Sequence, residues 1–394
     1  MAKAIIDGIT INKWVVDCPH TGNTGGGGID FTELGYDGTP KDIQDGYDYA
    51  LEIKNNWDAS VTNRRSAFSG DTKLVYFPEV DTRNVTNMRN MFYDCSYLSI
   101  FPTKLVTSAV TDMTNMFVGC TRLNNLDLSS FDTSNVTEMN YMFSNCNSLK
   151  TINVSSFNTS AVTNMNQMFN NCSALTSLDV SNFDTSNVTN FGDLFKGCGK
   201  LATLDLSNFN TSATTKMNGM FYNCSGLTNV DVSNFNTSKV TTMNAMFYGC
   251  KNLTSLDLSS FDTSNVTDFS TMLVCEKLEK VIGKLNLIKI NSTISSSYFV
   301  GYSANKTLRK LMLENFGYGK SVTSANMSYI NVWGVNSDSV PDAKQSLVDS
   351  LITYSYDRAT AGYTTCSVTL HANTKAVLTT DEIAQITAKG ITIA

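Results

Sequence analysis

The chain has little of what metal centres, nucleic-acid binding and membrane spans require. Its 394 residues include only two His and five Pro, and charged residues make up 16%. Two histidines exclude a histidine-rich metal site. The net charge of −6 argues against a nucleic-acid partner, because phosphate binding needs clustered Lys and Arg. No apolar run reaches about 18 residues, so we expect no membrane insertion. The hydrophobic fraction of 42% nevertheless suffices for a large core.

Cysteine and methionine are plentiful by contrast, at ten and sixteen residues. A fixed spacing of 25 or 26 residues relates eight of the cysteines: Cys95, Cys120, Cys146, Cys172, Cys198, Cys224, Cys250 and Cys275. Aligning the copies gives the consensus D-T-S-N-V-T-x-M-x-x-M-F-x-x-C-x-x-L-x-x-L-D-L-S-x-F. A period of this length predicts a repeat array in which stacked coils bury a continuous core.

Each copy is predicted to contain one short helix and one short strand. In residues 132–157, Met139, Met142, Phe143 and Cys146 have the i, i+3, i+4, i+7 spacing of one helical face. Ile152 and Val154 then alternate with polar residues, which indicates a strand with one buried face. The predicted fold class is therefore α/β: a leucine-rich-repeat-like solenoid of stacked parallel in-register strands and short helices, capped at both ends.

Equivalent residues of stacked coils are expected to line up in columns, and we interpret the cysteine and methionine columns as part of the hydrophobic core. Thirteen methionines fall in two columns of the helical face, where unbranched side chains fill irregular gaps. A methionine-lined metal site is disfavoured because Phe or Leu replaces Met in several copies. We expect buried free thiols rather than disulfides or zinc ligands. A chain of this size does not need disulfide bonds for stability, and a column of equivalent thiols offers no obvious way to pair them. Zinc binding is disfavoured because no C-x-x-C motif occurs.

The repeats resemble a known family. Leu253–Phe261, L-T-S-L-D-L-S-S-F, looks like the core of a leucine-rich repeat. The preceding Asn236–Cys250, N-T-S-K-V-T-T-M-N-A-M-F-Y-G-C, is more specific. Together they resemble the 26-residue repeat of BspA-like bacterial surface proteins, also described as a mycoplasma-type lipoprotein repeat. The resemblance covers residues 58–283 and implies a leucine-rich-repeat-type solenoid that acts in adhesion or recognition.

The sequence departs from that family in two respects. Phe261 stands where ordinary leucine-rich repeats place an Asn that forms a hydrogen-bonded ladder, so the turn after the strand must be satisfied differently. Members of the family also usually carry a signal peptide or a lipid-anchoring Cys, and Met1–Gly8 has neither pattern.

The repeats divide the chain into five predicted segments. The first is an attachment segment that ends in a glycine-rich linker, and it is followed by an N-terminal cap with a degenerate repeat. The repeat array, further degenerate repeats and a C-terminal cap complete the chain. Their predicted bounds are residues 1–28, 29–80, 81–283, 284–333 and 334–394.

Both caps have helix signals. Thr39-Pro40 opens a predicted helix with Ile43, Tyr47, Ala50 and Leu51 on its apolar face. Towards the C-terminus, a helical face (347–352), an alternating strand (366–370), a capping box (379–382) and a final strand at 391–393 are predicted.

Candidate contact residues lie on two exposed faces. One is a polar column along the predicted strands: Asp127, Asn153, Asp179, Asp205, Asp231 and Asp257. These side chains are read as solvated, with Ca²⁺ or a cationic partner as the alternative. The other face carries Tyr93, Tyr222 and Tyr248, which follow the buried Phe and offer contact points for sugar or protein.

No grouping fits an enzyme, and neither His20 nor His371 pairs with a recognisable nucleophile. We expect a non-enzymatic protein, without a cofactor, that presents a solenoid surface to a protein or glycan on a cell surface. The absence of a signal favours a virion surface or host-attachment component, joined to other virion proteins through residues 1–28. An exported bacterial adhesin and a purely structural virion spacer or decoration stay open.

Overall fold

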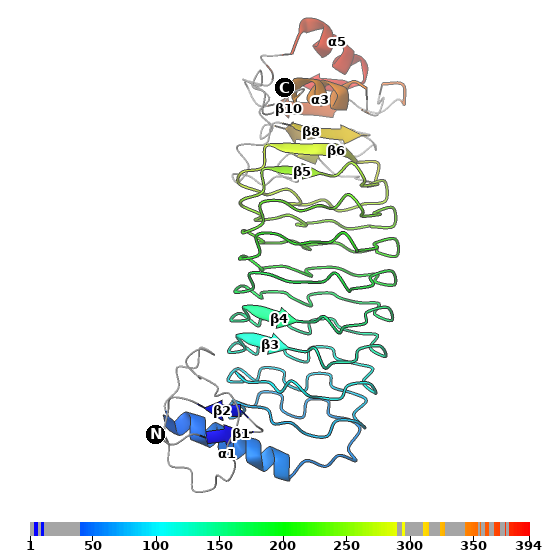
Figure 1. Ribbon diagram of the computed structural model, residues 1–394. Coiled ribbons are helices and arrows are strands. Elements are labelled where there is room, and N and C mark those ends of the chain that lie inside the picture. The colour runs from blue at the N-terminus through cyan, green and yellow to red at the C-terminus, as the bar shows by residue number, and fades with distance from the viewer. Residues whose placement is uncertain are drawn as a thin grey trace. The chain divides into compact units, whose positions relative to one another are not determined.

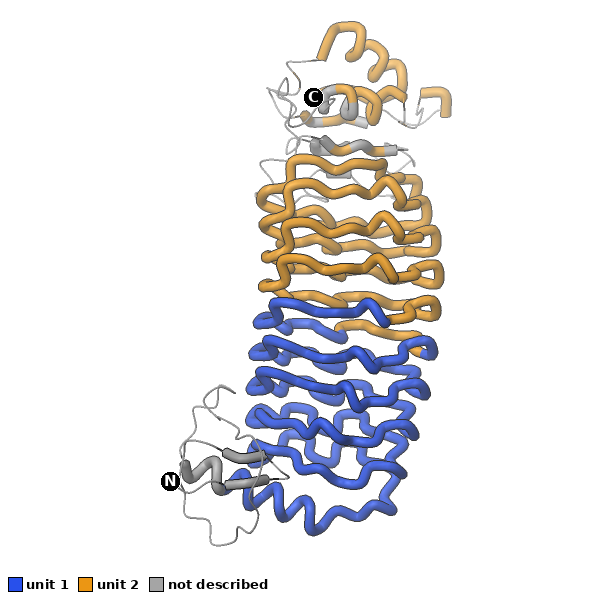
Figure 2. The backbone as a smooth tube through the Cα atoms, viewed as in Figure 1, with its two compact units in different colours: residues 1–161, 168–182 blue, residues 162–167, 183–394 orange. Residues whose placement is uncertain are grey.

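The computed structural model describes residues 4–6, 9–11, 40–289, 294–295, 310–314, 324–327, 343–353, 355, 359–361, 366–370, 375 and 378–394. The chain forms two compact units, residues 1–161 with 168–182 and residues 162–167 with 183–394 (Figure 2). Within each unit the chain winds into coils that lie one upon another (Figure 1). The five predicted segment boundaries are not tested by this division and stay predictions.

Neighbouring coils pair in parallel and in register. In unit 1, β3 (Asn125–Asp127) pairs with β4 (Thr151–Asn153). In unit 2, β5 (Ser255–Asp257) pairs with β6 (Lys280–Asn286), and β6 pairs with β8 (Lys310–Glu314). A second row of parallel bridges recurs every 24 to 26 residues elsewhere in the coils. The prediction of stacked parallel strands is therefore confirmed for these coils.

The predicted short helices are wrong. The described repeats contain no α-helix, and residues 139–146 form successive turns in which Tyr141 and Asn145 have a φ of 62°. The same two positions have positive φ in the other copies from Cys95 to Cys250: Asn90, Asp94, Asn115, Gly119, Gln167, Asn171, Asp193, Gly197, Gly219, Asn223, Ala245 and Gly249. The copy that holds Cys275 has only the first of them, Thr271. An α-helix needs negative φ at every residue, so two left-handed residues per coil prevent one.

The turns also distribute their hydrogen bonds differently from a helix. The Met142 N–H donates to the Met139 carbonyl at 3.3 Å, three residues back in the same coil. The next N–H, that of Phe143, donates to the Met168 carbonyl of the following coil at 2.9 Å. Because N–H groups alternate between these two kinds of partner, the turns join adjacent coils through the backbone, which a helix could not do.

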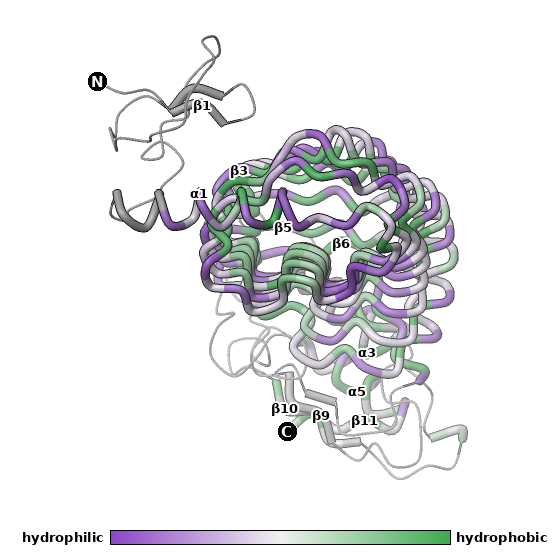
Figure 3. The backbone as a smooth tube through the Cα atoms, turned by 90° about the horizontal axis from the view of Figure 1, so that it is seen from below, coloured by the Kyte–Doolittle hydropathy of each residue, from purple (hydrophilic) through white to green (hydrophobic). Residues whose placement is uncertain are grey.

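The predicted interior columns are nevertheless confirmed. The eight repeat cysteines and the thirteen methionines of the two columns are fully buried. The buried Phe rings stack on the equivalent rings of neighbouring coils. In unit 1 the ring centroids of Phe117 and Phe143 are 5.8 Å apart and those of Phe143 and Phe169 are 5.4 Å apart; in unit 2 those of Phe221 and Phe247 are 5.3 Å apart. Apolar segments of successive coils lie in register in the view of Figure 3. Residues at i, i+3, i+4 and i+7 therefore face the interior in these turns, as they would on one face of a helix.

The buried cysteines are free thiols that link coils. The Cys146 thiol donates to the Phe117 carbonyl of the preceding coil at 3.1 Å, and Cys224 donates to Phe195 at 3.0 Å. Burial raises the pKa of Cys146 to about 12, which keeps the proton that this hydrogen bond needs. The cysteine column therefore satisfies buried carbonyl groups as well as filling space.

A threonine ladder takes the place of the missing asparagine ladder. Thr133 is fully buried; its hydroxyl donates to the Asn158 carbonyl at 2.9 Å and accepts the Asn158 N–H at 2.8 Å. Thr211 makes the same pair of bonds to Asn236 in unit 2. The second residue of D-T-S thus satisfies backbone groups of the next coil.

Helix α1 (Pro40–Asn55) lies against the first coil of unit 1. The Tyr49 hydroxyl donates to the Asp71 carboxylate at 2.5 Å, and Ala50 is buried. Leu51, predicted to face inward, is 40% exposed, so the apolar face is narrower than the sequence pattern indicates.

The C-terminal cap contains the predicted elements. Helix α3 (Ala343–Leu351) packs on β8, where the Leu313 N–H donates to the Ser350 hydroxyl at 2.9 Å. Helix α5 (Thr380–Ala388) begins with the predicted Thr379–Glu382 capping box. A parallel sheet has the order β11 (Ile391–Ile393), β10 (Cys366–Leu370), β9 (Ser324–Met327) and β7 (Ile294–Ser295).

At the N-terminal end, β1 (Ala4–Ile6) and β2 (Ile9–Ile11) form an antiparallel pair. The predicted linker at 22–28, Cys18, His20 and His371 lie outside the described residues.

Candidate functional site

The six residues of the predicted polar column are all exposed. Each side-chain oxygen accepts the backbone N–H of the residue two positions on; Asp179 accepts that of Ser181 at 3.0 Å and Asp231 that of Ser233 at 2.9 Å. Hydrogen bonds from Ser181 hold the pKa of Asp179 below its usual value. The column therefore shapes the turn after each strand.

Among the described residues, no group of three or more His, Cys, Asp or Glu is placed to hold a metal ion. Coordination of Ca²⁺ requires six to eight oxygen ligands. The carboxylates of the column are instead oriented by the backbone of their own coil.

Two of the three candidate tyrosines lie together in unit 2. The rings of Tyr222 and Tyr248 stack with centroids 4.6 Å apart and an interplanar angle of 8°. The Lys196 ammonium, from the preceding coil, lies 4.9 Å from the Tyr222 centroid and 3.6 Å from Asp193. Burial and the neighbouring Tyr248 raise the pKa of Tyr222. We call Lys196, Tyr222 and Tyr248 the tyrosine cluster.

The tyrosine cluster presents ring edges rather than ring faces. Lys196 and Tyr248 come from the coils on either side of Tyr222, so both faces of the Tyr222 ring are covered. Both tyrosines are half-buried, which leaves edges and hydroxyl groups for contacts. Tyr93 occupies the same repeat position in unit 1 and is also half-buried.

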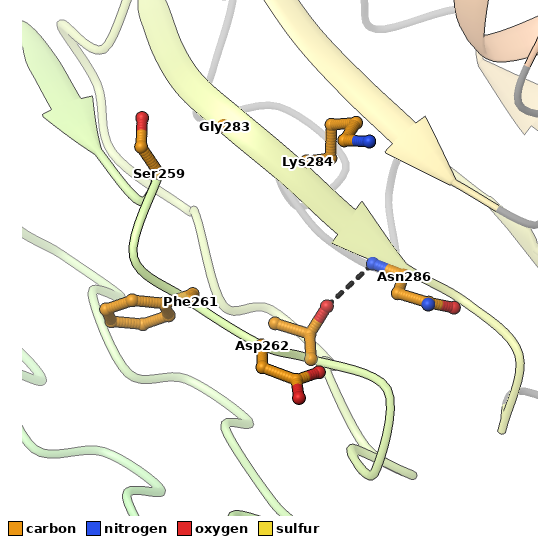
Figure 4. Close-up of a pocket in the computed structure, with 7 residues that line it drawn as sticks. Ser259, Phe261, Asp262, Gly283, Lys284 and Asn286 are labelled. Carbon is orange, nitrogen blue, oxygen red and sulfur yellow. Dashed lines mark hydrogen bonds between the residues drawn. The ribbon is translucent and has the colours of Figure 1, made fainter. Parts of the chain in front are cut away.

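A cavity of about 310 Å³ lies beside β5 and β6 at the end of the regular repeats in unit 2 (Figure 4). Seven residues line this end cavity: Ser259, Phe261, Asp262, Thr263, Gly283, Lys284 and Asn286. Sequence analysis did not identify it. The visible signal was the change in cysteine spacing from 26 to 25 residues between Cys250 and Cys275.

The end cavity arises because one coil is short. The Asn286 N–H donates to the Thr263 hydroxyl at 2.6 Å across 23 residues (Figure 4), whereas the equivalent bond from Asn236 to Thr211 spans 25. β6 continues as a strand for seven residues, with a register shift between Lys280 and Lys284, where the other coils turn at Ser-x-Phe. The Phe261 ring stacks on that of Phe235 in the preceding coil, with ring centroids 6.4 Å apart. Phe261 is 7% exposed, which is more than the equivalent Phe residues of the preceding coils.

Glycine is required in the wall of the end cavity. Gly283 has a φ of 93°, and a Cβ there would lie 2.7 Å from the Leu258 carbonyl oxygen. Only glycine allows β6 to approach β5 so closely. The Asp262 side chain accepts the Ser264 N–H at 3.0 Å, and hydrogen bonds from Ser264 lower the pKa of Asp262. The cavity thus combines an ionised carboxylate, an ammonium, an amide, hydroxyls and the edge of an aromatic ring.

Comparison with known proteins identifies a repeat family. The family model described as "Mycoplasma protein of unknown function, DUF285" matches four overlapping stretches, residues 62–175, 98–204, 146–230 and 193–310, which together exceed half of the chain. No curated protein matches.

Solved structures also give matches. One is the crystal structure of a TLR13–ssRNA13 complex, at 14% sequence identity and a TM-score of 0.22. The alignment covers 84% of this chain and 56% of that one. Among the residues that the structure describes, no helix is long and apolar enough to cross a membrane.

Proposed function

Since the chain belongs to the DUF285 family of mycoplasma-type repeat proteins, we propose that it is a non-enzymatic recognition protein whose exposed repeat surface binds a protein or glycan on a cell surface. The interior of each described coil is devoted to packing and to backbone hydrogen bonds. Ligand contacts then fall to the exposed and half-buried positions, and the position two residues before each Cys differs from copy to copy.

The observation that carries the proposal is the tyrosine cluster. One repeat position holds Tyr93, Val118, Ser144 and Asn170 in unit 1 and Lys196, Tyr222 and Tyr248 in successive coils of unit 2, so two adjacent tyrosines occur at it only in unit 2. Stacking alone does not require this choice, since Ser or Val serves equally well as a neighbour. Tyrosine edges with a nearby cation offer apolar area and hydrogen-bonding groups at low entropic cost, as in many recognition surfaces.

The test is binding of the full chain to intact cells of candidate hosts and to a glycan array. The variant Tyr222→Ala/Tyr248→Ala is expected to lose at least about tenfold in affinity, as removal of two central aromatic contacts does. Tyr93→Ala is the matched control, because Tyr93 has the same repeat position and similar exposure. Equal binding by the unaltered chain, Tyr222→Ala/Tyr248→Ala and Tyr93→Ala would contradict a role for the tyrosine cluster.

Location and assembly form the second part of the proposal. A virion surface or host-attachment component, joined through residues 1–28, is favoured over an exported adhesin. Immunogold labelling of purified virions and of cells separates these two locations. A purely structural spacer or decoration predicts no binding to any cell or glycan, and that result would contradict recognition as a whole.

A further inference from the structure

We propose that the end cavity is a binding site for a single neutral saccharide unit. The proposal rests on the recognition function above and gives it a ligand class at a second, separate place in unit 2. The cavity lies between the Ser259–Thr263 turn and strand β6.

The size of the cavity limits its ligand. A volume of about 310 Å³ is near the lower end of ligand pockets, which range from about 300 to 1,000 Å³. A nucleotide or a folded peptide exceeds this space. One sugar ring, or the terminal unit of a longer glycan, does not.

The charges select a neutral, polyhydroxylated molecule. The Asp262 carboxylate is ionised at neutral pH and disfavours an anion, while the Lys284 ammonium disfavours a cation. The Asn286 amide also lines this space, as does the Ser259 hydroxyl, which donates its proton to Asp257 at 2.6 Å and can only accept from a ligand. Together these groups provide both donors and acceptors around one space. Sugar hydroxyls both donate and accept, so they match such a lining.

The aromatic ring at the cavity wall supports the same ligand class. Phe261 follows Phe235 in the column of stacked Phe rings and lines the cavity, with 7% of the residue exposed. The C–H face of a pyranose ring is apolar and packs on such carbon surface. Gly283 leaves the opposite wall without a side chain.

The experiment is ligand-observed saturation-transfer NMR with the full chain. The probes are neutral hexoses and N-acetylhexosamines, with sialic acid as the anionic comparator. We expect binding of at least one neutral sugar with a Kd in the millimolar range, and none of sialic acid. Asp262→Asn is expected to weaken binding about tenfold, because a hydrogen bond to a charged group is lost. Ser259→Trp, which fills the cavity mouth, is expected to abolish it.

Matched controls come from the regular repeats. Asp132→Asn changes an Asp at the same repeat position, where Ser134 donates its N–H at 3.0 Å just as Ser264 does. Ser129→Trp places the same bulk at the position that corresponds to Ser259. Both controls are expected to bind sugar as the unaltered chain does, and circular dichroism checks that all four variants fold.

The two proposals fail in different ways. Absence of any neutral-sugar signal, or a signal that survives both Ser259→Trp and Asp262→Asn, would overturn the saccharide site. Cell binding that persists in those variants and is lost in Tyr222→Ala/Tyr248→Ala would leave the recognition function in place without this cavity.

Discussion

Replacing one threonine of the ladder tests how the coils are held together. In Thr133→Val the hydroxyl that bonds both the N–H and the carbonyl of Asn158 disappears, while the side-chain volume stays similar. Each backbone group left without a partner costs about 1–3 kcal/mol when buried. The extra methyl group returns about 0.8 kcal/mol. Because the Asn158 backbone is only partly buried, we expect a net loss of about 2 kcal/mol in the free energy of opening this pair of coils.

Amide hydrogen exchange is the appropriate assay, because repeat arrays need not unfold in one step. The N–H groups of Phe143 and Asn145 join the same two coils and report on their separation. A loss of about 2 kcal/mol corresponds to exchange about 30-fold faster. The control is Thr111→Val, whose exposed hydroxyl donates to the Thr86 carbonyl at 3.3 Å and whose loss costs less than about 0.5 kcal/mol. Indistinguishable exchange in the two variants would refute the threonine ladder as a stabilising feature.

Two further predictions concern the turns and the thiols. Ala245→Gly is expected to stabilise the protein by about 1 kcal/mol, because Ala245 has a φ of 55°, which glycine adopts more readily. The control is Ala202→Gly, which should destabilise the protein because Ala202 lacks a positive φ. Thermal melting compares the two variants. The pKa of Cys146 rises from 9.0 to about 12 on burial, so its contribution to stability is complete below pH 9 and is lost as the pH rises towards 12. Urea titrations across this range should show the unaltered chain losing about 1.4 kcal/mol per pH unit more than Cys146→Ser, and parallel losses would contradict the buried-thiol assignment.

The sequence contained enough to predict the interior but not the backbone of each coil. The spacing of Met139, Met142, Phe143 and Cys146 identifies inward-facing positions, and those positions are buried. The same spacing fits a helix and a pair of left-handed turns equally well. The distinguishing signal was the residue before each Cys, which is Gly, Asn or Asp from Asp94 to Gly249. These are the residues that adopt positive φ most readily.

The end cavity could not be predicted because it depends on hydrogen-bond register. A change of one residue in cysteine spacing is visible in the sequence, but it does not show where a coil shortens. Only the bond from Asn286 to Thr263 reveals that β6 reaches the next coil with two residues fewer. The tyrosine stack, by contrast, follows from the repeat period, because Tyr222 and Tyr248 are 26 residues apart at one position.

The most direct test of the stacked-coil account is thiol labelling, resolved by peptide mass spectrometry, of the native and the denatured protein. The eight repeat cysteines are buried. Thiols along the column donate to a carbonyl of the preceding coil, as those of Cys120, Cys146, Cys172, Cys224, Cys250 and Cys275 do. The account predicts that an alkylating reagent leaves these cysteines unmodified under native conditions and labels all eight after denaturation. Rapid native labelling of most of them would contradict it.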